Sequence, residues 1–298
     1  MKQKYITMLA LATVLSSCKD NELFEKEMYK NDVALISSSY YNTFQEIVPL
    51  TGNEVTGYIA ASAGGTHAST KDLVIQLEDD LTQLDFYNRS LFDFDTKLYA
   101  KLLPRNKYEI LDPKIQIKAG DRTGRTMVKL RPDGLSPDST YFIGLKATAG
   151  PGVEINSKKT TILYQVLIKN DYASQAQNTF YSMTGLVNGM VTAGNKKLFP
   201  LSANSVRVIA GTESFESTEP MINKTSIVLE VAADKSVTIK PYKDIKVKQI
   251  NGDARYPNVF RIEESFGRKF NVFLLSYEYT INNVVKTMQE ELRIEIVR

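Results

Sequence analysis

The amino-acid sequence predicts an all-β fold in two domains, and three observations support this class. Apolar runs rich in Val, Ile, Thr and Tyr recur along the chain, separated by Gly, Pro, Asn or Asp residues that favour turns. Many runs alternate apolar and polar residues, which is the period of a strand with one buried face. The 298 residues exceed an ordinary single domain, and the spacing of the runs changes near Asn170.

The chain begins with the pattern of a secretory signal peptide. Residues 1–4 include two lysines, residues 5–15 are mostly apolar, and two serines precede Cys18. The apolar segment is shorter than the ~20 residues of a membrane-spanning helix, so it predicts a signal core rather than an anchor. A cysteine directly after Leu-Ser-Ser matches the lipobox of bacterial lipoproteins. We therefore expect cleavage after residue 17, a lipid anchor on Cys18 and a charged tether over residues 18–31.

The composition excludes several classes of function. Cys18 is the only cysteine, so the mature chain offers no internal disulfide, no second thiolate and no cysteine cluster for zinc. Loss of Lys2 and Lys4 with the signal peptide lowers the formal charge by two, from +3 to +1. Such a chain has no broadly basic surface for phosphate neutralisation, so we expect no nucleic-acid partner and no cofactor.

Residues 32–169 predict an immunoglobulin-like β-sandwich, because short strands alternate with turns at the spacing of a small sandwich. Ile115 and Ile117 share one face of their strand, while Gln116 and Lys118 share the other. The predicted strands are 55–61, 73–77, 114–118, 126–130, 141–147 and 161–168.

One helix interrupts these strands. Asp79 and Asp80 are suited to capping a helix in which Leu81, Leu84 and Tyr87 recur at helical spacing. A second short turn is expected over residues 98–102, before Pro104. Further along, Leu-Ser-Pro-Asp-Ser-Thr leads into Tyr141, which is placed like the tyrosine that fixes a corner in sandwich domains.

Residues 170–298 predict a second β domain with longer strands and short turns. Residues 268–280 and 284–297 flank Asn282-Asn283 as a terminal hairpin. A meander of this length favours an antiparallel, barrel-like domain of the calycin or lipocalin type.

Several segments together carry a resemblance to a known family. They occur in the order Leu84 to Asn88, Leu102 to Pro104 with Tyr108, Ile115 to Gly120, and Leu135 to Tyr141, followed by Phe270 to Tyr279 and Gln289 to Arg293. The first four resemble the N-terminal domain of Bacteroidetes surface lipoproteins, which also precedes family 18 glycoside hydrolase modules. The last two resemble its companion C-terminal domain. The resemblance implies a glycan-binding accessory protein beside a Sus-type transporter, held at the outer membrane and facing the cell exterior, as does the Lys-Asp-Asn-Glu segment after Cys18.

The residues do not predict catalysis. His67 lies in a Gly-rich loop, and no Gly-x-Ser-x-Gly motif supplies a nucleophile for it. Carboxylate pairs occur, but the catalytic Asp-x-x-Asp-x-Asp-x-Glu string of family 18 hydrolases is absent. No segment has the spacing of a calcium-binding loop. We expect no enzyme activity and no metal site.

The candidate glycan-binding residues are Tyr256, Asp253 and Arg255 in one loop, with Tyr242 in another. A ring stacks on the C–H groups of a sugar face, and charged side chains bind hydroxyls. The chain has no tryptophan, and a structural place for both tyrosines at the rim of the barrel is the alternative that their loop positions favour. The alternative function is a structural or adhesive lipoprotein that binds host or matrix protein.

Asp138-Ser139-Thr140 resembles the site of periplasmic O-glycosylation in Bacteroidetes and lies in a predicted turn. Ser139 is therefore the candidate glycan-carrying residue. The same triplet also suits a purely structural turn.

Overall fold

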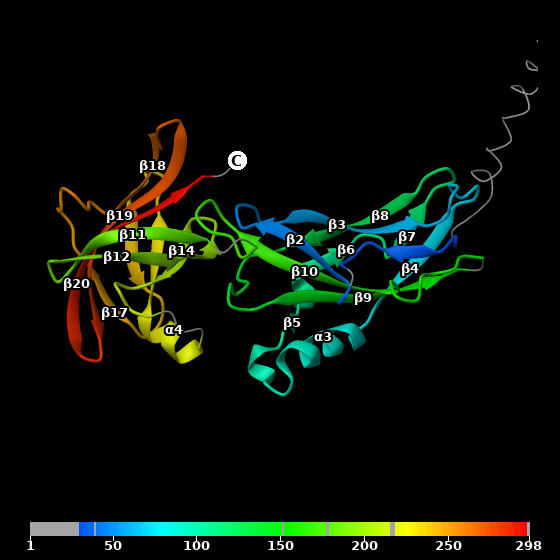
Figure 1. The fold of residues 1–298 in the computed structure, drawn as a ribbon, viewed down its shortest axis with the longest axis horizontal. Helices are drawn as coiled ribbons and strands as arrows, with labels where there is room; N and C mark the ends of the chain where they lie inside the picture. The colour runs from blue at the N-terminus through cyan, green and yellow to red at the C-terminus, as the bar shows by residue number, and fades with distance from the viewer. Residues whose placement is uncertain (1–29, 39, 151, 177–178, 215–217, 297–298) are drawn as a thin grey trace, which may run out of the picture.

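The computed structural model describes residues 30–296, apart from residues 39, 151, 177–178 and 215–217. The predicted signal peptide and Cys18 lie outside the described residues. Nearly all regular structure is strand, arranged in four sheets that form two pairs along the long axis of the molecule (Figure 1). The predicted all-β class is confirmed.

The first pair of sheets forms a β-sandwich. One sheet has the order β1-β3-β8-β6, and the other has the order β2-β10-β9-β4-β7, with β5 added beside β9. Ile115 and Ile117 are buried between the sheets, as their alternation predicted. The strands are β1 (Val33–Leu35), β2 (Thr43–Pro49), β3 (Val55–Ala63), β4 (Leu73–Asp79), β5 (Lys101–Leu102), β6 (Tyr108–Ile110), β7 (Lys114–Ile117), β8 (Thr123–Leu130), β9 (Tyr141–Ala149) and β10 (Thr161–Lys169).

The predicted helix is α3 (Thr82–Phe92), which packs on the outer face of the larger sheet. Its first backbone amide, Thr82 N, donates to the Asp80 carboxylate at 2.7 Å, so Asp80 acts at the helix start. The turn predicted at 98–102 is only partly correct. A 3-10 turn, η1 (Thr96–Leu98), is followed by β5, which pairs parallel with β9, and a second such turn is η2 (Arg105–Lys107).

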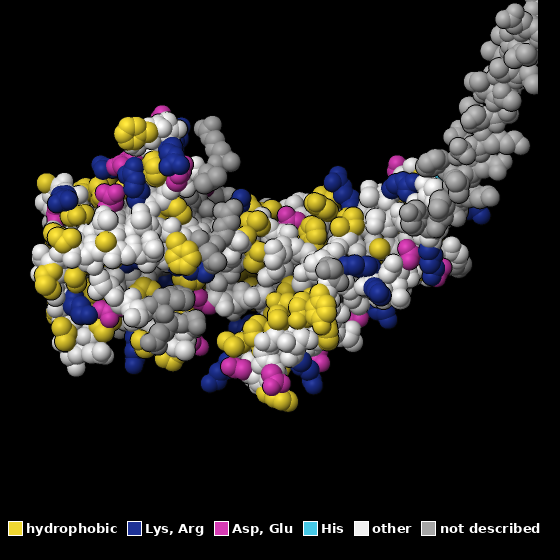
Figure 2. All heavy atoms as spheres, viewed as in Figure 1, with side chains coloured by type: hydrophobic (Ala, Val, Ile, Leu, Met, Phe, Trp, Pro, Cys, Tyr) yellow, Lys and Arg dark blue, Asp and Glu magenta, His cyan; other side chains and the backbone are white. Residues whose placement is uncertain are grey.

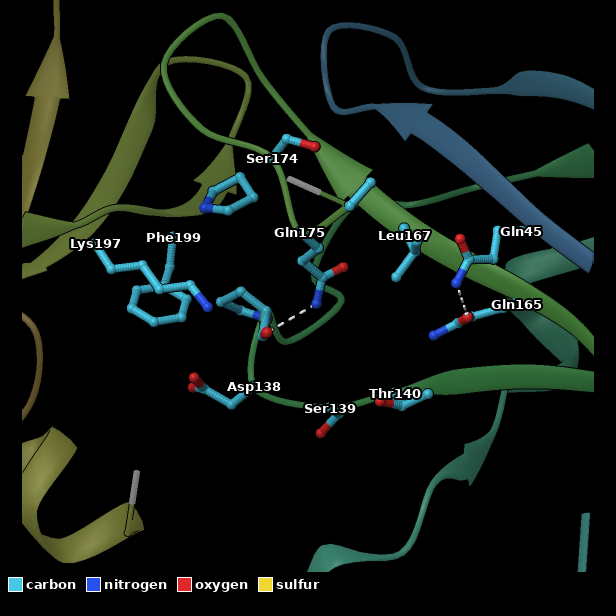
Figure 3. Close-up of a pocket in the computed structure, with 13 residues that line it drawn as sticks. Gln45, Asp138, Ser139, Thr140, Gln165, Leu167, Ser174, Gln175, Lys197 and Phe199 are labelled. Atoms are coloured by element: carbon cyan, nitrogen blue, oxygen red, sulfur yellow. Dashed lines mark hydrogen bonds between the residues drawn. The ribbon is translucent and has the colours of Figure 1, made fainter. Parts of the chain in front are cut away.

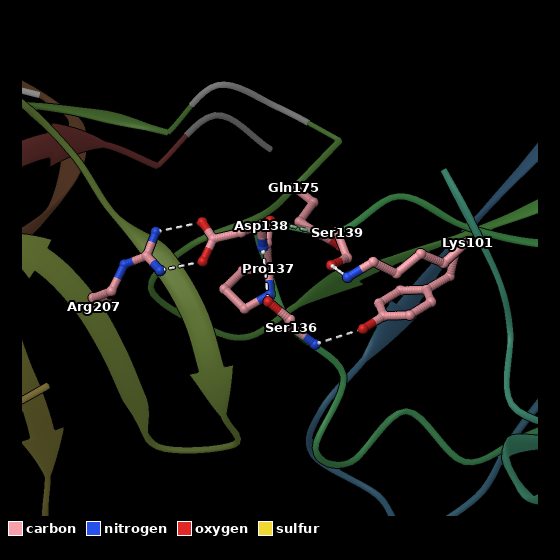
Figure 4. A network of polar contacts seen from close by, with 8 residues as sticks. Lys101, Ser136, Pro137, Asp138, Ser139, Gln175 and Arg207 are labelled. Carbon is pink, nitrogen blue, oxygen red and sulfur yellow. Dashed lines mark hydrogen bonds and ion pairs between the residues drawn. The ribbon is translucent and has the colours of Figure 1, made fainter. Parts of the chain in front are cut away.

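The tyrosine corner is present in this sandwich. Ser136 N donates to the Tyr141 hydroxyl at 3.5 Å, so the ring fixes the turn that enters β9. This turn carries Pro137 and Asp138 towards the second pair of sheets (Figure 4).

The second pair consists of curled half-barrel sheets, as the barrel-like prediction requires. One sheet has the order β12-β11-β20-β19-β17 with β18 beside β19, and the other has the order β13-β14-β15-β16. Asn282 and Asn283 both have positive φ (51° and 64°), which gives the predicted terminal hairpin its tight turn. The elements are β11 (Phe180–Val187), β12 (Met190–Lys197), β13 (Phe199–Ser202), β14 (Ser205–Ile209), α4 (Glu219–Thr225), β15 (Ser226–Val231), β16 (Val237–Pro241), β17 (Lys246–Gln249), β18 (Val259–Ser265), β19 (Arg268–Ile281) and β20 (Val284–Glu295).

Asn170 stands where the chain passes from one core to the other. The first core ends with Ile168, and the second begins with Tyr172. The Asn170 amide nitrogen donates to the carbonyl oxygens of Ser202 (2.7 Å) and Ser205 (2.9 Å). The Asn170 side chain therefore holds the connection against the second domain through two hydrogen bonds.

Candidate functional site

An aromatic cluster lies on the surface of the first domain, where the segment before β2 meets α3. We call Tyr40, Tyr41, Phe86 and Tyr87 the aromatic platform. Ring centroids are 4.6 Å apart for Tyr40 and Tyr41, and 5.8 Å apart for Tyr41 and Phe86. Tyr40 is 70% exposed and Phe86 is 45% exposed. Figure 2 shows hydrophobic side chains gathered over α3.

The platform has a rigid base. Tyr87 packs edge-on against Phe142 of β9, with ring centroids 5.0 Å apart. Phe142 and Leu163 of the sheet are buried against Leu84 of the helix. The buried Asn88 amide donates to Ala100 O at 3.0 Å and accepts from Ala100 N at 2.8 Å. These contacts fix α3 on the sheet, so the helix presents Phe86 from a rigid backbone, with little backbone freedom to lose on binding.

Polar groups lie among these rings. The Gln83 side chain donates to Tyr41 O at 3.0 Å and so joins the helix to the segment before β2. Burial raises the pKa of the Tyr87 phenol further above its ordinary value, so the hydroxyl is neutral and able to donate a hydrogen bond. Aromatic faces with neutral hydroxyls and amides suit a sugar, whose C–H face packs on a ring while its hydroxyls bond outward.

The residues of the platform were not among the binding residues predicted from the sequence. The available signal was the pair Tyr40-Tyr41, together with a second pair, Phe86-Tyr87, on a predicted helix. Nothing in the sequence spacing shows that residues 40–41 and 86–87 meet, because that proximity arises from the packing of α3 on β9 and β10, next to the segment that precedes β2.

A second feature is a cavity of about 290 Å³ at the seam between the domains, which we call the seam pocket (Figure 3). Gln45 and Gln165 form its wall in the first domain, and Phe199 stands opposite in the second. The remaining lining residues come from both domains and are Pro137, Asp138, Ser139, Thr140, Leu167, Ser174, Gln175, Ala176, Lys197 and Pro200.

An ion pair closes one side of the seam. Arg207 is 1% exposed, and its two terminal nitrogens both bond the Asp138 carboxylate, one at 2.6 Å (Figure 4). The guanidinium carbon also lies 4.4 Å from the Phe199 ring centroid and 5.1 Å from that of Tyr242. Gln175 adds a second link by donating to Pro137 O at 2.8 Å. These contacts hold the two domains in one arrangement.

The candidate Ser139 lies beside this ion pair. It is half-buried at the rim of the seam pocket, and its hydroxyl accepts a hydrogen bond from Lys101 Nζ at 3.1 Å. Glycosylation of Ser139 stays a prediction, and a glycan there would stand at the seam between the domains.

The structure does not support Tyr256 as a stacking face. Its side chain is only 5% exposed and packs with Val272 and Leu274 in a small apolar cluster. Asp253 shapes the loop instead, because its Oδ1 accepts from Arg255 N at 2.9 Å and from Tyr256 N at 3.0 Å, and these bonds lower its pKa. Arg255 is exposed, with its guanidinium carbon 5.5 Å from the Tyr256 ring centroid. The loop turns its ring inward because Val272 and Leu274 leave an apolar hollow there.

Tyr242 lies away from the loop of Tyr256, against Arg207. It is half-buried over Arg207, and Lys243 Nζ lies 5.7 Å from its ring centroid. The ring covers the buried guanidinium rather than joining the loop of Tyr256, so the structure does not bring these candidates together.

A buried polar network in the second domain has a structural role. The side chains of Lys196 and Glu290 are 6% and 0% exposed, and Lys196 Nζ lies 2.5 Å from Glu290 Oε2. The Tyr277 hydroxyl donates to Glu290 at 2.7 Å and accepts from Gly211 N at 2.8 Å. Burial lowers the pKa of Lys196 and raises that of Tyr277. Since these groups are enclosed by the core, they offer a substrate no access.

Two features are absent from the part of the chain that the structure describes. Its acidic, histidine and cysteine side chains do not cluster in groups of three or more that would suit a metal ion. Its helices are too short or too polar to cross a membrane. His67 lies in an exposed loop.

Comparison with known proteins agrees with this two-domain architecture. A family model for an N-terminal domain matches residues 24–154, and one for a C-terminal domain matches residues 160–293. The chain belongs to this two-domain family. Solved structures of similar fold come from Bacteroides. No curated protein matches the chain.

Solved structures share the fold over nearly the whole length. A protein of unknown function from Bacteroides ovatus is 16% identical, with a TM-score of 0.65 over 92% of this chain and 93% of that one. An auxiliary nutrient binding protein from Bacteroides thetaiotaomicron is 14% identical, with a TM-score of 0.59 over 87% of this chain and 94% of that one. At these identities the likeness concerns the fold alone.

Proposed function

We propose that this protein is a non-catalytic glycan-binding accessory lipoprotein that captures glycan at the outer surface of a Bacteroides-type cell for a neighbouring Sus-type transporter. The observation that carries the proposal is the aromatic platform, with Tyr40 70% exposed and Phe86 45% exposed on a rigid base. Exposed aromatic clusters on a folded surface mark binding sites. A protein of the same fold described as nutrient binding supports the same function class.

The binding residues differ from those predicted from the sequence. The platform replaces the loop of Tyr256, whose ring is buried. Attachment to the membrane rests on Cys18 and the signal peptide pattern that precedes it. Lipidation of Cys18 would tether the first domain, which carries the platform, to the membrane.

The test is a polysaccharide affinity-gel and glycan-array screen of the mature chain, followed by calorimetric titration. Replacing both Tyr40 and Phe86 by alanine is expected to weaken binding of the selected glycan by about ten-fold or more, because two stacking rings are lost. Stability is expected to change little, since both side chains are largely exposed.

The matched control is Phe180→Ala. Phe180 is 51% exposed but lies on β11 of the second domain, so its loss is expected to leave glycan affinity unchanged. Unchanged affinity in the Tyr40 and Phe86 double variant would place the glycan site elsewhere. A screen in which no glycan binds would instead favour the alternative of a protein-binding lipoprotein.

A further inference from the structure

The aromatic platform and the seam pocket lie on the same face of one sheet. In the parallel pair β2 and β10, Thr43 stands opposite Leu163, Gln45 opposite Gln165, and Ile47 opposite Leu167. Leu163 belongs to the small core beneath α3, whereas Gln165 and Leu167 line the seam pocket. The sheet surface under the platform therefore continues directly into the wall of the pocket.

Strand β9 also brings the platform close to the seam pocket. Tyr87 of the platform packs on Phe142, and Thr140, two residues earlier in the chain, lines the pocket. Two residues of extended chain span about 7 Å. Along β10, the four residues from Leu163 beneath α3 to Leu167 in the pocket span about 13 Å. The two features together are long enough for several sugar rings in a row.

The lining of the pocket is suited to a neutral, polyhydroxylated ligand. Gln45 Nε2 donates to Gln165 Oε1 at 2.9 Å. Among the described residues, the other side-chain atoms, Gln45 Oε1 and Gln165 Nε2, have no hydrogen-bond partner. The Ser139 hydroxyl accepts from Lys101 and so retains its own proton for donation. Phe199 and Leu167 supply apolar surface, and the Asp138 carboxylate is bound to Arg207. Lys197 also lines the pocket, with its Nζ 5.1 Å from the Phe199 ring centroid.

We propose that the platform and the seam pocket are two subsites of one track that binds an extended, uncharged, linear oligosaccharide. This inference rests on the proposed glycan-binding function and adds the ligand's form: a chain whose sugar rings stack on Tyr40 and Phe86 at one end and hydrogen-bond Gln45 and Gln165 at the other. The seam pocket joins the two domains, so their fixed arrangement is what keeps the track continuous.

The experiment is calorimetric titration of the full mature chain with neutral linear oligosaccharides of the malto, cello, xylo, manno and laminari series, from disaccharide to octasaccharide. For the series that binds, affinity is expected to rise about ten-fold or more with length, because the second subsite acts at high effective concentration. Gln45→Ala and Gln165→Ala, singly and together, are expected to remove that gain and leave disaccharide affinity unchanged. Phe86→Ala is expected to weaken every length.

The control is Gln76→Ala, a glutamine on β4 of the same sheet that does not line the pocket. Gln45 is exposed, so its single variant tests the pocket even if Gln165→Ala lowers stability. Affinity that does not rise with length, or an octasaccharide that binds the Gln45 and Gln165 variants as tightly as Gln76→Ala, would overturn the track while leaving glycan binding intact. Failure of every series to bind would overturn both proposals.

Discussion

The buried guanidinium of Arg207 in the second domain holds the carboxylate of Asp138 in the first, and this pair is the central polar link across the seam (Figure 4). Arg207 lies between the rings of Phe199 and Tyr242, so its charge is shielded from water on both faces. Asp138 is 31% exposed in its side chain. The arginine therefore depends on the aspartate for compensation far more than the aspartate depends on the arginine.

Asp138→Ala is expected to destabilise the protein by about 2 to 4 kcal/mol, because it leaves a buried guanidinium without its carboxylate. The measurement is urea unfolding followed by tryptophan-independent signals such as circular dichroism. Asp133→Ala is the matched control, since Asp133 is exposed in the preceding turn and its loss should change the free energy of unfolding by less than about 0.5 kcal/mol. Equal effects of the two substitutions would show that the ion pair does not join the domains.

Tyr256→Ala is expected to lower the free energy of unfolding by about 3 kcal/mol, since the 5% exposed ring fills an apolar cluster with Val272 and Leu274. Thermal melting measures this effect, and Arg255→Ala in the same loop serves as the control with little change expected. A fully stable Tyr256→Ala protein that has lost glycan affinity would return the binding site to this loop.

Stability is expected to decrease as the pH rises above about 10. Burial raises the pKa of Tyr164, Tyr181, Tyr277 and Tyr279, so these phenols keep their protons in the folded state while the unfolded chain releases them near pH 10. The unfolded state then binds fewer protons, and the free energy of unfolding falls with pH. Each tyrosine contributes up to about 1.4 kcal/mol per pH unit.

Lys196 acts in the opposite direction, because burial lowers its pKa and the unfolded chain binds the proton more readily below pH 10.5. Four tyrosines outweigh one lysine above pH 10. Denaturant unfolding at a series of alkaline pH values measures how the free energy of unfolding changes with pH. Tyr181→Phe should reduce this slope by the contribution of one titrating proton. A free energy of unfolding that stays level to pH 12 would contradict burial of these phenols.

Cys18→Ala is expected to release the protein from the membrane fraction, because no other cysteine can carry a lipid. Detergent-phase partitioning and the mass of the N-terminal peptide measure the change. Cys18→Ser is a second variant with nearly the same side-chain size and the same expected loss. A wild-type N-terminal peptide that carries no lipid mass would show that the anchor prediction is wrong.

The sequence by itself determined six strands of the first domain and the last hairpin of the second. Ile115 and Ile117 alternate with polar residues and are buried, Tyr141 fixes its corner, and Asn282-Asn283 forms the turn of the last hairpin. These features depend on side-chain period and on local backbone preference, which neighbouring residues specify.

The tertiary structure alone decided where the candidate sites lie. Tyr40 and Phe86 are far apart in the chain and meet only because α3 packs on β9 and β10, next to the segment before β2. Asp138 and Arg207 meet only because the two domains abut. Tyr256 follows a Gly-Asp turn that looks exposed in sequence, yet its ring is buried because Val272 and Leu274 lie beneath it. Whether a loop aromatic faces solvent or core depends on residues distant in sequence, and a sequence pattern carries no information about that packing.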